Sequence, residues 1–404
     1  MRVNYLRMLR TPHAFRVLSA SWIGRLPSSM AAVTIPLALR HAGAGYAFIG
    51  AAAACFAISA AVGAPVLGRA VDRIGQTRVL AATTVLAAAG FVLIALAPAQ
   101  HPTVLLGAVL AGAFTPPLEP CLRVLWPDIF AQEELENVYA VDSAAQELVF
   151  VAGPLAVSLC LAIAAPITAL WVQAALSVLG VLVFATAAPS RRWRPSPHDR
   201  HWLGPLRNLG LIIVLLAPSG AGMSIGTLNV LSVSYAEQHR VPGGAPMLLA
   251  VFSLASLAGV LGYGAIRWTI QPRTRLLVSV GGLLIGWLLL TLVPPPVPMF
   301  AVLLLTGMFL APTLASVWLL IGMLAPAGTT TEAFAWLVTL FAAGNSMGAA
   351  LVGVVLTHAS THWAAACGVF GVTGCLLLLG LGYRRLAPPA PDRVAQSSAT
   401  GQAG

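Results

Sequence analysis

The stretch Gly68-Arg69-Ala70-Val71-Asp72-Arg73-Ile74-Gly75-Gln76-Thr77-Arg78-Val79-Leu80 indicates how the whole chain is organised. It places three arginines and one aspartate between two long apolar runs, in a chain of which only 8% of the residues are charged. Glycines at both ends allow a tight turn and a close approach between helices. The stretch therefore predicts a short cationic cytoplasmic connector between two membrane helices.

The composition of the rest of the chain indicates a membrane protein. The 404 residues are 58% hydrophobic with a mean hydropathy of +0.88, whereas about a quarter of the residues of a soluble domain are charged. The net charge of +10 does not predict nucleic-acid binding, because the arginines lie beside membrane spans and not on a soluble fold. We predict an all-α polytopic membrane protein that contacts the lipid bilayer and no nucleic acid.

Apolar runs long enough to cross a bilayer, about twenty residues each, occur twelve times. They cover residues 14–39, 46–67, 79–98, 103–126, 135–163, 166–188, 207–235, 245–268, 275–293, 299–323, 331–357 and 363–383. Eighteen of the 22 arginines lie at the termini or in alternate connections, and only Arg40 and Arg240 lie in the others. The positive-inside rule then places both termini in the cytoplasm, in a multi-pass protein of the plasma or inner membrane.

The two halves of the chain resemble one another at an offset of about 195 residues. Gly112 corresponds to Gly307, and Gly153 corresponds to Gly348. We predict two six-helix halves, at residues 1–188 and 207–386. A charged, proline-rich linker at residues 189–206 joins them, and a disordered cytoplasmic tail covers residues 387–404.

The opening stretch resembles a known family motif. Its spacing Gly-x-x-x-Asp-Arg-x-Gly-x-x-Arg is similar to the loop motif of major facilitator superfamily transporters, between their second and third helices. The matching residues are Gly68, Asp72, Arg73, Gly75 and Arg78, while Gln76 stands where a basic residue is usual. The resemblance implies twelve transmembrane helices in two pseudo-symmetric six-helix bundles, with substrate bound between them.

The resemblance also implies a gate at the cytoplasmic end. Asp72 is expected to cap the N-terminus of the eleventh span near residues 329–331, where the helix dipole is positive. Arg73 or Arg78 is expected to pair with Asp128, at the end of the fourth span. These contacts would hold the cytoplasmic side closed.

Five charged residues lie at membrane depth, all in the first half. They are Arg25, Glu119, Arg123, Asp142 and Glu147. Buried charges are costly and normally face a cavity or a partner, and a carboxyl group in a partly dry cavity can carry a proton. We take Asp142, or failing that Glu147, as the proton carrier; the alternative is that Asp142 is a gate residue.

The three remaining charges each allow two interpretations. Glu119 and Arg123 are four residues apart and share a helix face, so they form either a self-neutralised pair or a pair in which Arg123 exchanges Glu119 for Asp142. Arg25 either offsets these acids or attracts an anionic substrate, and we favour the first interpretation.

Substrate-cavity candidates come from both halves. The amides Gln146, Asn229 and Asn345 need polar partners if they are buried, and the aromatic residues Trp336 and Phe341 suit an apolar ligand; ordinary helix packing is the alternative. Gly153-Pro154 resembles the core of the fifth-helix motif of antiporters in this superfamily, although the flanking glycines of that motif are missing. The alternative there is a proline-kinked packing helix.

These features favour a secondary transporter that exchanges protons for an apolar or amphipathic small molecule, resembling proton-coupled drug or metabolite efflux members. A proton symporter or a facilitator for uptake of a sugar or organic acid is the alternative. No H-E-x-x-H, G-x-S-x-G or lysine-containing phosphate loop occurs, so we expect neither an enzyme nor an ATP-driven pump. No C-x-x-C spacing occurs either, so we expect no metal and no cofactor. A monomer is expected from the fold.

Overall fold

The structure of the protein is a computed structural model, and it describes all residues except 1–10, 196–203, 243, 267 and 388–404. The side chains of residues 46, 47, 136, 147 and 150 are also outside the description. Within this part of the chain every regular element is a helix. The predicted tail lies outside the described residues except for its first residue, and the residue limits of the two halves and linker remain predictions.

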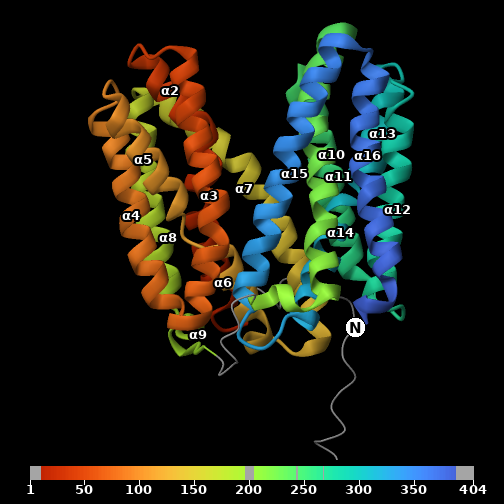
Figure 1. The fold of residues 1–404 in the computed structure, drawn as a ribbon, viewed down its shortest axis with the longest axis horizontal. Coiled ribbons are helices and arrows are strands. Elements are labelled where there is room, and N and C mark those ends of the chain that lie inside the picture. The colour runs from red at the N-terminus through yellow and green to blue at the C-terminus, as the bar shows by residue number, and fades with distance from the viewer. Residues whose placement is uncertain (1–10, 196–203, 243, 267, 388–404) are drawn as a thin grey trace, which may run out of the picture.

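The helices form two bundles (Figure 1). The first half contains α2 (Ala14–His41), α3 (Tyr46–Ile74), α4 (Gln76–Leu96), α5 (His101–Ala113), α6 (Leu118–Ile129), α7 (Leu135–Ile163) and α8 (Pro166–Ala185). The second half contains α10 (Leu209–His239), α11 (Gly244–Ala265), α12 (Pro272–Leu290), α13 (Pro296–Gly307), α14 (Leu310–Leu324), α15 (Thr330–His358) and α16 (Thr361–Gly382). Short helices lie at one end of the molecule: η1 (Gln132–Glu134), α9 (Ala188–Arg192), η2 (Gly204–Arg207) and η3 (Tyr383–Leu386).

The helices account for the twelve predicted spans. In the described chain, eleven helical segments are long and apolar enough to cross a membrane. The twelfth span is α2, which is 28 residues long but less apolar because it contains Arg25 and several hydroxyl side chains. The all-α, twelve-span fold predicted from the sequence is confirmed.

Two of the spans are broken near their middle, at equivalent places in the two halves. The fourth span consists of α5 and α6, which are separated by residues 114–117. Pro116 and Pro117 explain this break, because proline lacks the N–H that a helix interior requires. The tenth span consists of α13 and α14, and Pro312 follows that break.

Equivalent glycines in the two halves make the same close helix–helix contact. A Cβ on Gly112 would collide with the Phe56 carbonyl oxygen, and a Cβ on Gly307 would collide with the Phe252 carbonyl oxygen. The two halves therefore use the same close approach, of α5 to α3 and of α13 to α11, at positions that match along the chain.

The quoted stretch differs from its predicted conformation. Residues 68–74 are the last turns of α3, and only Gly75, with φ of +101°, lies between α3 and α4. Gly68 is inside the helix, where an added Cβ would lie 2.9 Å from the Glu332 Cα atom of α15. Gly68 therefore allows the two halves to touch and does not form a turn.

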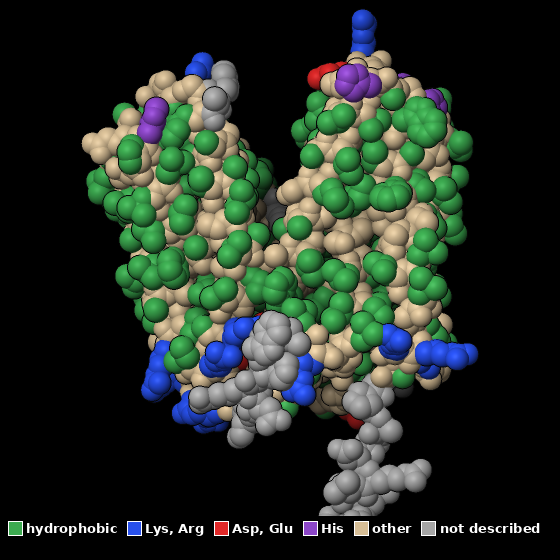
Figure 2. Space-filling view, in the orientation of Figure 1, with side chains coloured by type: hydrophobic (Ala, Val, Ile, Leu, Met, Phe, Trp, Pro, Cys, Tyr) green, Lys and Arg blue, Asp and Glu red, His purple; other side chains and the backbone are tan. Residues whose placement is uncertain are grey.

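The two halves meet at one end of the molecule. There α3 packs against α15, and α7 packs against α11 and α14. Most of the exposed arginines of the connections gather at this end, while the opposite end is hollowed between the halves and carries few (Figure 2). We call the first of these the arginine-rich end; it includes Arg73, Arg78, Arg191, Arg192, Arg273 and Arg384.

Candidate functional site

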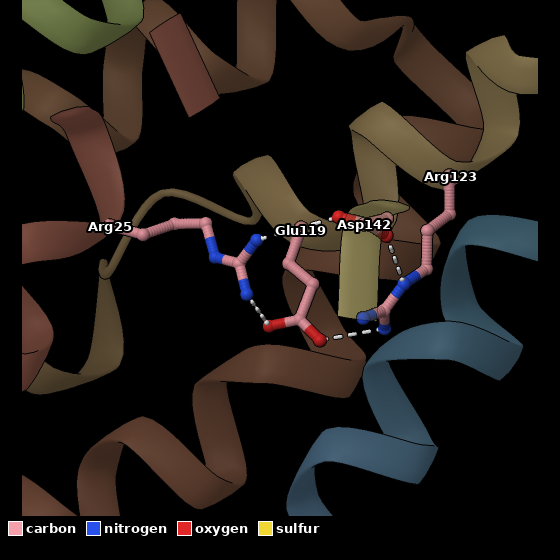
Figure 3. A network of polar contacts seen from close by, with 4 residues as sticks. All are labelled: Arg25, Glu119, Arg123 and Asp142. Carbon is pink, nitrogen blue, oxygen red and sulfur yellow. Dashed lines mark hydrogen bonds and ion pairs between the residues drawn. The ribbon is translucent and has the colours of Figure 1, made fainter. Parts of the chain in front are cut away.

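Four charged side chains from three helices of the first half form one network (Figure 3). Arg25 of α2 donates to Glu119 of α6 with a distance of 3.0 Å between Nη2 and Oε2. Arg123 of α6 places Nη1 2.6 Å from Glu119 Oε1 and donates Nε–H to Asp142 of α7, at 3.0 Å from Oδ2. Arg25 Nη1 also lies 3.8 Å from Asp142 Oδ1. The network contains two positive and two negative side chains.

The local sequence explains how α6 presents two of these charges. Because α6 begins at Leu118, Glu119 lies in its first turn, where the helix dipole stabilises a carboxylate. Arg123 follows one turn later on the same face. The broken fourth span therefore turns a helix N-terminus and an ion pair towards α2 and α7.

Burial makes the charge balance of this network important. The Arg123 and Asp142 side chains have no exposed surface, and Arg25 is 9% exposed. Glu119 is the most exposed member at 18%. Removing one partner from such a buried set leaves an uncompensated charge, which typically costs about 3–5 kcal/mol.

The contacts of Arg123 and Arg25 can be compared with the two roles considered for each residue from the sequence. Arg123 contacts Glu119 and Asp142 at the same time, so this structure contains no exchange of one acid for the other. Arg25 contacts both acids, which is the geometry expected if it offsets their charge.

The second half adds aromatic rings to the network, which the sequence analysis did not predict. The Arg123 guanidinium carbon lies 3.4 Å from the centroid of the Trp318 ring of α14. It also lies 5.7 Å from the centroid of the Phe334 ring of α15. Phe334 stands 195 residues after Tyr139, at the offset of the repeat between the two halves.

The end of α3 caps α15 across the two halves. Asp72 is 3% exposed, and its carboxylate accepts the backbone N–H groups of Thr331 at 3.3 Å and of Glu332 at 2.9 Å. These are orphan donors at a helix N-terminus, where a carboxylate also interacts favourably with the dipole. The structure thus contains the cap that the family resemblance implied for Asp72.

An ion pair beside the cap was not predicted. Arg69 donates two hydrogen bonds to the Glu332 carboxylate, one from Nε at 2.9 Å and one from Nη2 at 2.5 Å. Glu332 is 2% exposed and also receives the indole N–H of Trp336 at 3.4 Å. Such a two-pronged arginine–carboxylate pair is strong and geometrically specific.

The predicted pairing of Arg73 or Arg78 with Asp128 was wrong. All three side chains are exposed, and no ion pair joins them among the described residues. The physical reason is that the helix continues to Ile74, which turns Arg69 towards α15 and leaves Arg73 pointing to solvent.

The substrate-cavity candidates lie in different environments. Gln146, Trp336, Phe341 and Asn345 are half-buried, whereas Asn229 is exposed. The Gln146 side-chain oxygen is buried without a hydrogen-bond partner among the described residues. Of the proton-carrier candidates, Asp142 is described and the side chain of Glu147 lies outside the described residues.

Gly153 lies where α7 packs closely on α2, whereas Pro154 beside it is exposed. A Cβ on Gly153 would collide with Ser29, whose hydroxyl donates to the Val149 carbonyl oxygen at 3.1 Å. Gly348, the repeat partner of Gly153, packs in the same way against the Met223 backbone of α10. Both positions are therefore packing contacts in this structure.

No cluster of three or more His, Cys, Asp or Glu side chains in the described chain could hold a metal ion. The arrangement instead suits movement of a proton or a side chain, because paired charges are buried where the two halves meet. The fold and this network define a class: multi-pass helical membrane proteins built from two repeated bundles.

Comparison with known proteins identifies the family. Residues 17–349 match the family model of the Major Facilitator Superfamily, and the chain therefore belongs to that superfamily of membrane transporters. No significant match was found among curated proteins.

Solved structures share the fold. A bacterial homologue of the iron transporter ferroportin in an outward-facing state matches with a TM-score of 0.75 and 11% identity, over 91% of this chain and 98% of that chain. A proton:xylose symporter matches at 0.71 and 12% identity over 92% and 96% of the two chains. The E. coli fucose:proton symporter matches at 0.69 and 13% identity over 91% and 97%. At these identities the likeness concerns the fold alone.

Proposed function

We propose that this chain is a secondary active transporter that exports an apolar or amphipathic small molecule in exchange for protons, by rocker-switch alternating access. The observation that carries this proposal is the buried network of Arg25, Glu119, Arg123 and Asp142. It lies wholly in the first half, while the second half faces it with aromatic rings. Such asymmetry suits one half for coupling and the other for an apolar ligand.

The orientation follows from the charge distribution. We place the arginine-rich end and both termini in the cytoplasm, in agreement with the positive-inside rule. In this proposed orientation the hollow between the halves (Figure 2) opens to the outside of the cell membrane, which corresponds to an outward-facing state. The transporter acts as a monomer in this proposal.

Asp142 is our proposed proton carrier. Its protonation would remove one negative charge and leave Arg25 and Arg123 with Glu119 as their single charged carboxylate. A net positive charge in this dry site is unfavourable. Proton binding therefore favours a rearrangement of the network, and Glu147 is the second candidate for the same role.

The contacts of Asp72 and Arg69 with α15 form our proposed cytoplasmic gate. Each must break before the arginine-rich end can open, because Asp72 and Arg69 lie in the first half and their partners in the second. Gly68 and Gly75 support the gate by allowing the close approach and the turn after it.

Symport of a sugar or other small metabolite is the second candidate function. Two structures with the same fold are described as proton symporters, one for fucose and one for xylose. A facilitator without proton coupling would have the same fold, with the network then holding the helices together only.

A liposome experiment separates these functions. Purified protein is reconstituted with an internal pH dye, and gradients of lipophilic cations, lipophilic neutral compounds, sugars and organic acids are imposed in turn. Proton movement opposite to one class, lost in Asp142→Asn, supports antiport. Proton movement in the same direction as the substrate establishes symport and overturns the efflux proposal.

The control variant is Asp128→Asn, which removes an exposed carboxylate of the same half. It should retain the proton flux of the parent protein. If Asp142→Asn still concentrates substrate against its gradient, Asp142 is not the proton carrier, and Glu147→Gln becomes the next variant to measure.

A further inference from the structure

Trp318 is a side chain of the second half that contacts the charged network directly. The Arg123 guanidinium stacks on its ring, with the guanidinium carbon 3.4 Å from the ring centroid. Trp318 is 2% exposed and Arg123 is fully buried, so the contact is shielded from water. Desolvation strengthens an arginine–tryptophan contact of this kind.

The two faces of the contact belong to different halves of the molecule. Arg123 forms its ion pairs with Glu119 and Asp142 of the first half, whereas Trp318 belongs to α14, which packs against α7. Arg123 Nη2 has no hydrogen-bond partner among the described residues. The position of the guanidinium plane is therefore fixed by the two carboxylates on its edge and by the indole on its face.

We propose that Trp318 is a positioning residue through which the second half senses the charge state of the network. With both acids charged, Arg123 is held flat under the ring and the stack adds to the closure of the arginine-rich end. When Asp142 takes up a proton, Arg123 loses a charged partner on its Nε side and moves towards Glu119. The stack then weakens, and α14 separates more easily from the first half.

The groups around Arg123 make this response depend on pH. Glu119 and Asp142 are the acids in contact with it, and among the described residues of the first half Arg25 and Tyr139 are the other titratable groups beside them. From the second half, the rings of Trp318 and Phe334 face it. The second half adds no acid to the ion pairs of Arg123 in the described chain, so the aromatic contact carries the response.

The test measures the opening of the arginine-rich end without any substrate. Spin labels are attached to Thr77→Cys and Gln271→Cys, which are exposed positions of the two halves at that end, after alanine replaces the native cysteines. Distance distributions in nanodiscs give the ratio of open to closed molecules from mildly alkaline to mildly acidic pH.

Trp318→Leu should raise the open-to-closed ratio about tenfold or more at alkaline pH, the size of a desolvated cation–π contact. In the same variant, the open-to-closed ratio should also depend less on pH. Trp318→Phe retains an aromatic face and should restore most of the pH dependence. In the Asp142→Asn background, Trp318→Leu should have little further effect, because Arg123 has already lost a charged partner.

Trp287→Leu is the matched control, since Trp287 is a fully buried tryptophan of the same half that packs against Gly368 and has no cation–π contact with an arginine among the described residues. It should leave the pH dependence intact even if it lowers stability. An unchanged ratio and pH dependence in Trp318→Leu would overturn the proposal, as would equal behaviour of the Leu and Phe variants. Because no substrate is used, these results stand whether or not transport proves to be antiport.

Discussion

Replacing Asp72 by alanine tests the gate most directly, because one side chain caps two backbone donors across the two halves. Its carboxylate oxygens lie 3.3 Å from the Thr331 nitrogen and 2.9 Å from the Glu332 nitrogen, in a site that is 3% exposed. Alanine leaves both N–H groups at the start of α15 without this acceptor. The closed state loses these bonds, whereas a state with the halves apart never contained them.

The size of the effect follows from the cap and the dipole. Loss of an N-cap side chain costs about 1–2 kcal/mol. Loss of a charge at a partly buried helix end costs up to about 2 kcal/mol more. A total of about 2–3 kcal/mol, the middle of the summed range, corresponds to a rise of roughly 30- to 150-fold in the open-to-closed ratio. Asp72→Asn should show a smaller rise, since asparagine can still cap a helix.

The assay uses a cysteine at Thr331, a fully buried side chain inside the gate. Its rate of modification by a membrane-impermeant thiol reagent, added from the arginine-rich side, reports opening at that end. The rate should rise strongly in Asp72→Ala and stay at the parent value in Asp128→Ala, which removes an exposed acid. Equal rates in the parent and Asp72→Ala would refute the gate.

Three further predictions concern stability and general transport. Arg69→Gln should lower the free energy of unfolding by about 3 kcal/mol, because it leaves the buried Glu332 carboxylate without its cation; adding Glu332→Gln should recover much of the loss in a denaturation measurement. Gly307→Ala should lower the thermal midpoint, since its Cβ would collide with the neighbouring helix, while Gly281→Ala, which meets no atom within 4 Å, should not. Arg25→Ala should reduce transport of every substrate in the liposome panel; selective loss of anionic substrates would instead make it a substrate-binding residue.

The sequence predicted the fold well because the relevant signals are local. A span needs only an apolar run of sufficient length, and each run appears whatever its neighbours are. The repeat was visible in the sequence because equivalent helices in the two halves pack equally closely. Gly112 and Gly307, for example, both lie against the backbone of a neighbouring helix, where a larger residue would collide. The membrane-depth charges were visible because so few charged residues interrupt the spans.

The contacts of those charges were harder to predict. Arg69 and Glu332 are 263 residues apart, and Arg69 was not part of the matching motif. The motif was interpreted as a loop, so its arginines were expected at the connection between helices and paired with Asp128. A single additional fact, that α3 continues to Ile74, changes which arginine faces the other half.

The sequence by itself determined the membrane class, the twelve spans, the two-fold repeat and the chemical types of residue at membrane depth. Composition and periodicity fix these because each helix must satisfy its own backbone hydrogen bonds in lipid. Only the tertiary structure decided that Arg123 lies under Trp318, that Asp72 caps α15 and that Arg69 holds Glu332. These contacts join the two halves, and their geometry depends on how the two bundles pack against each other, which no local pattern in either half encodes.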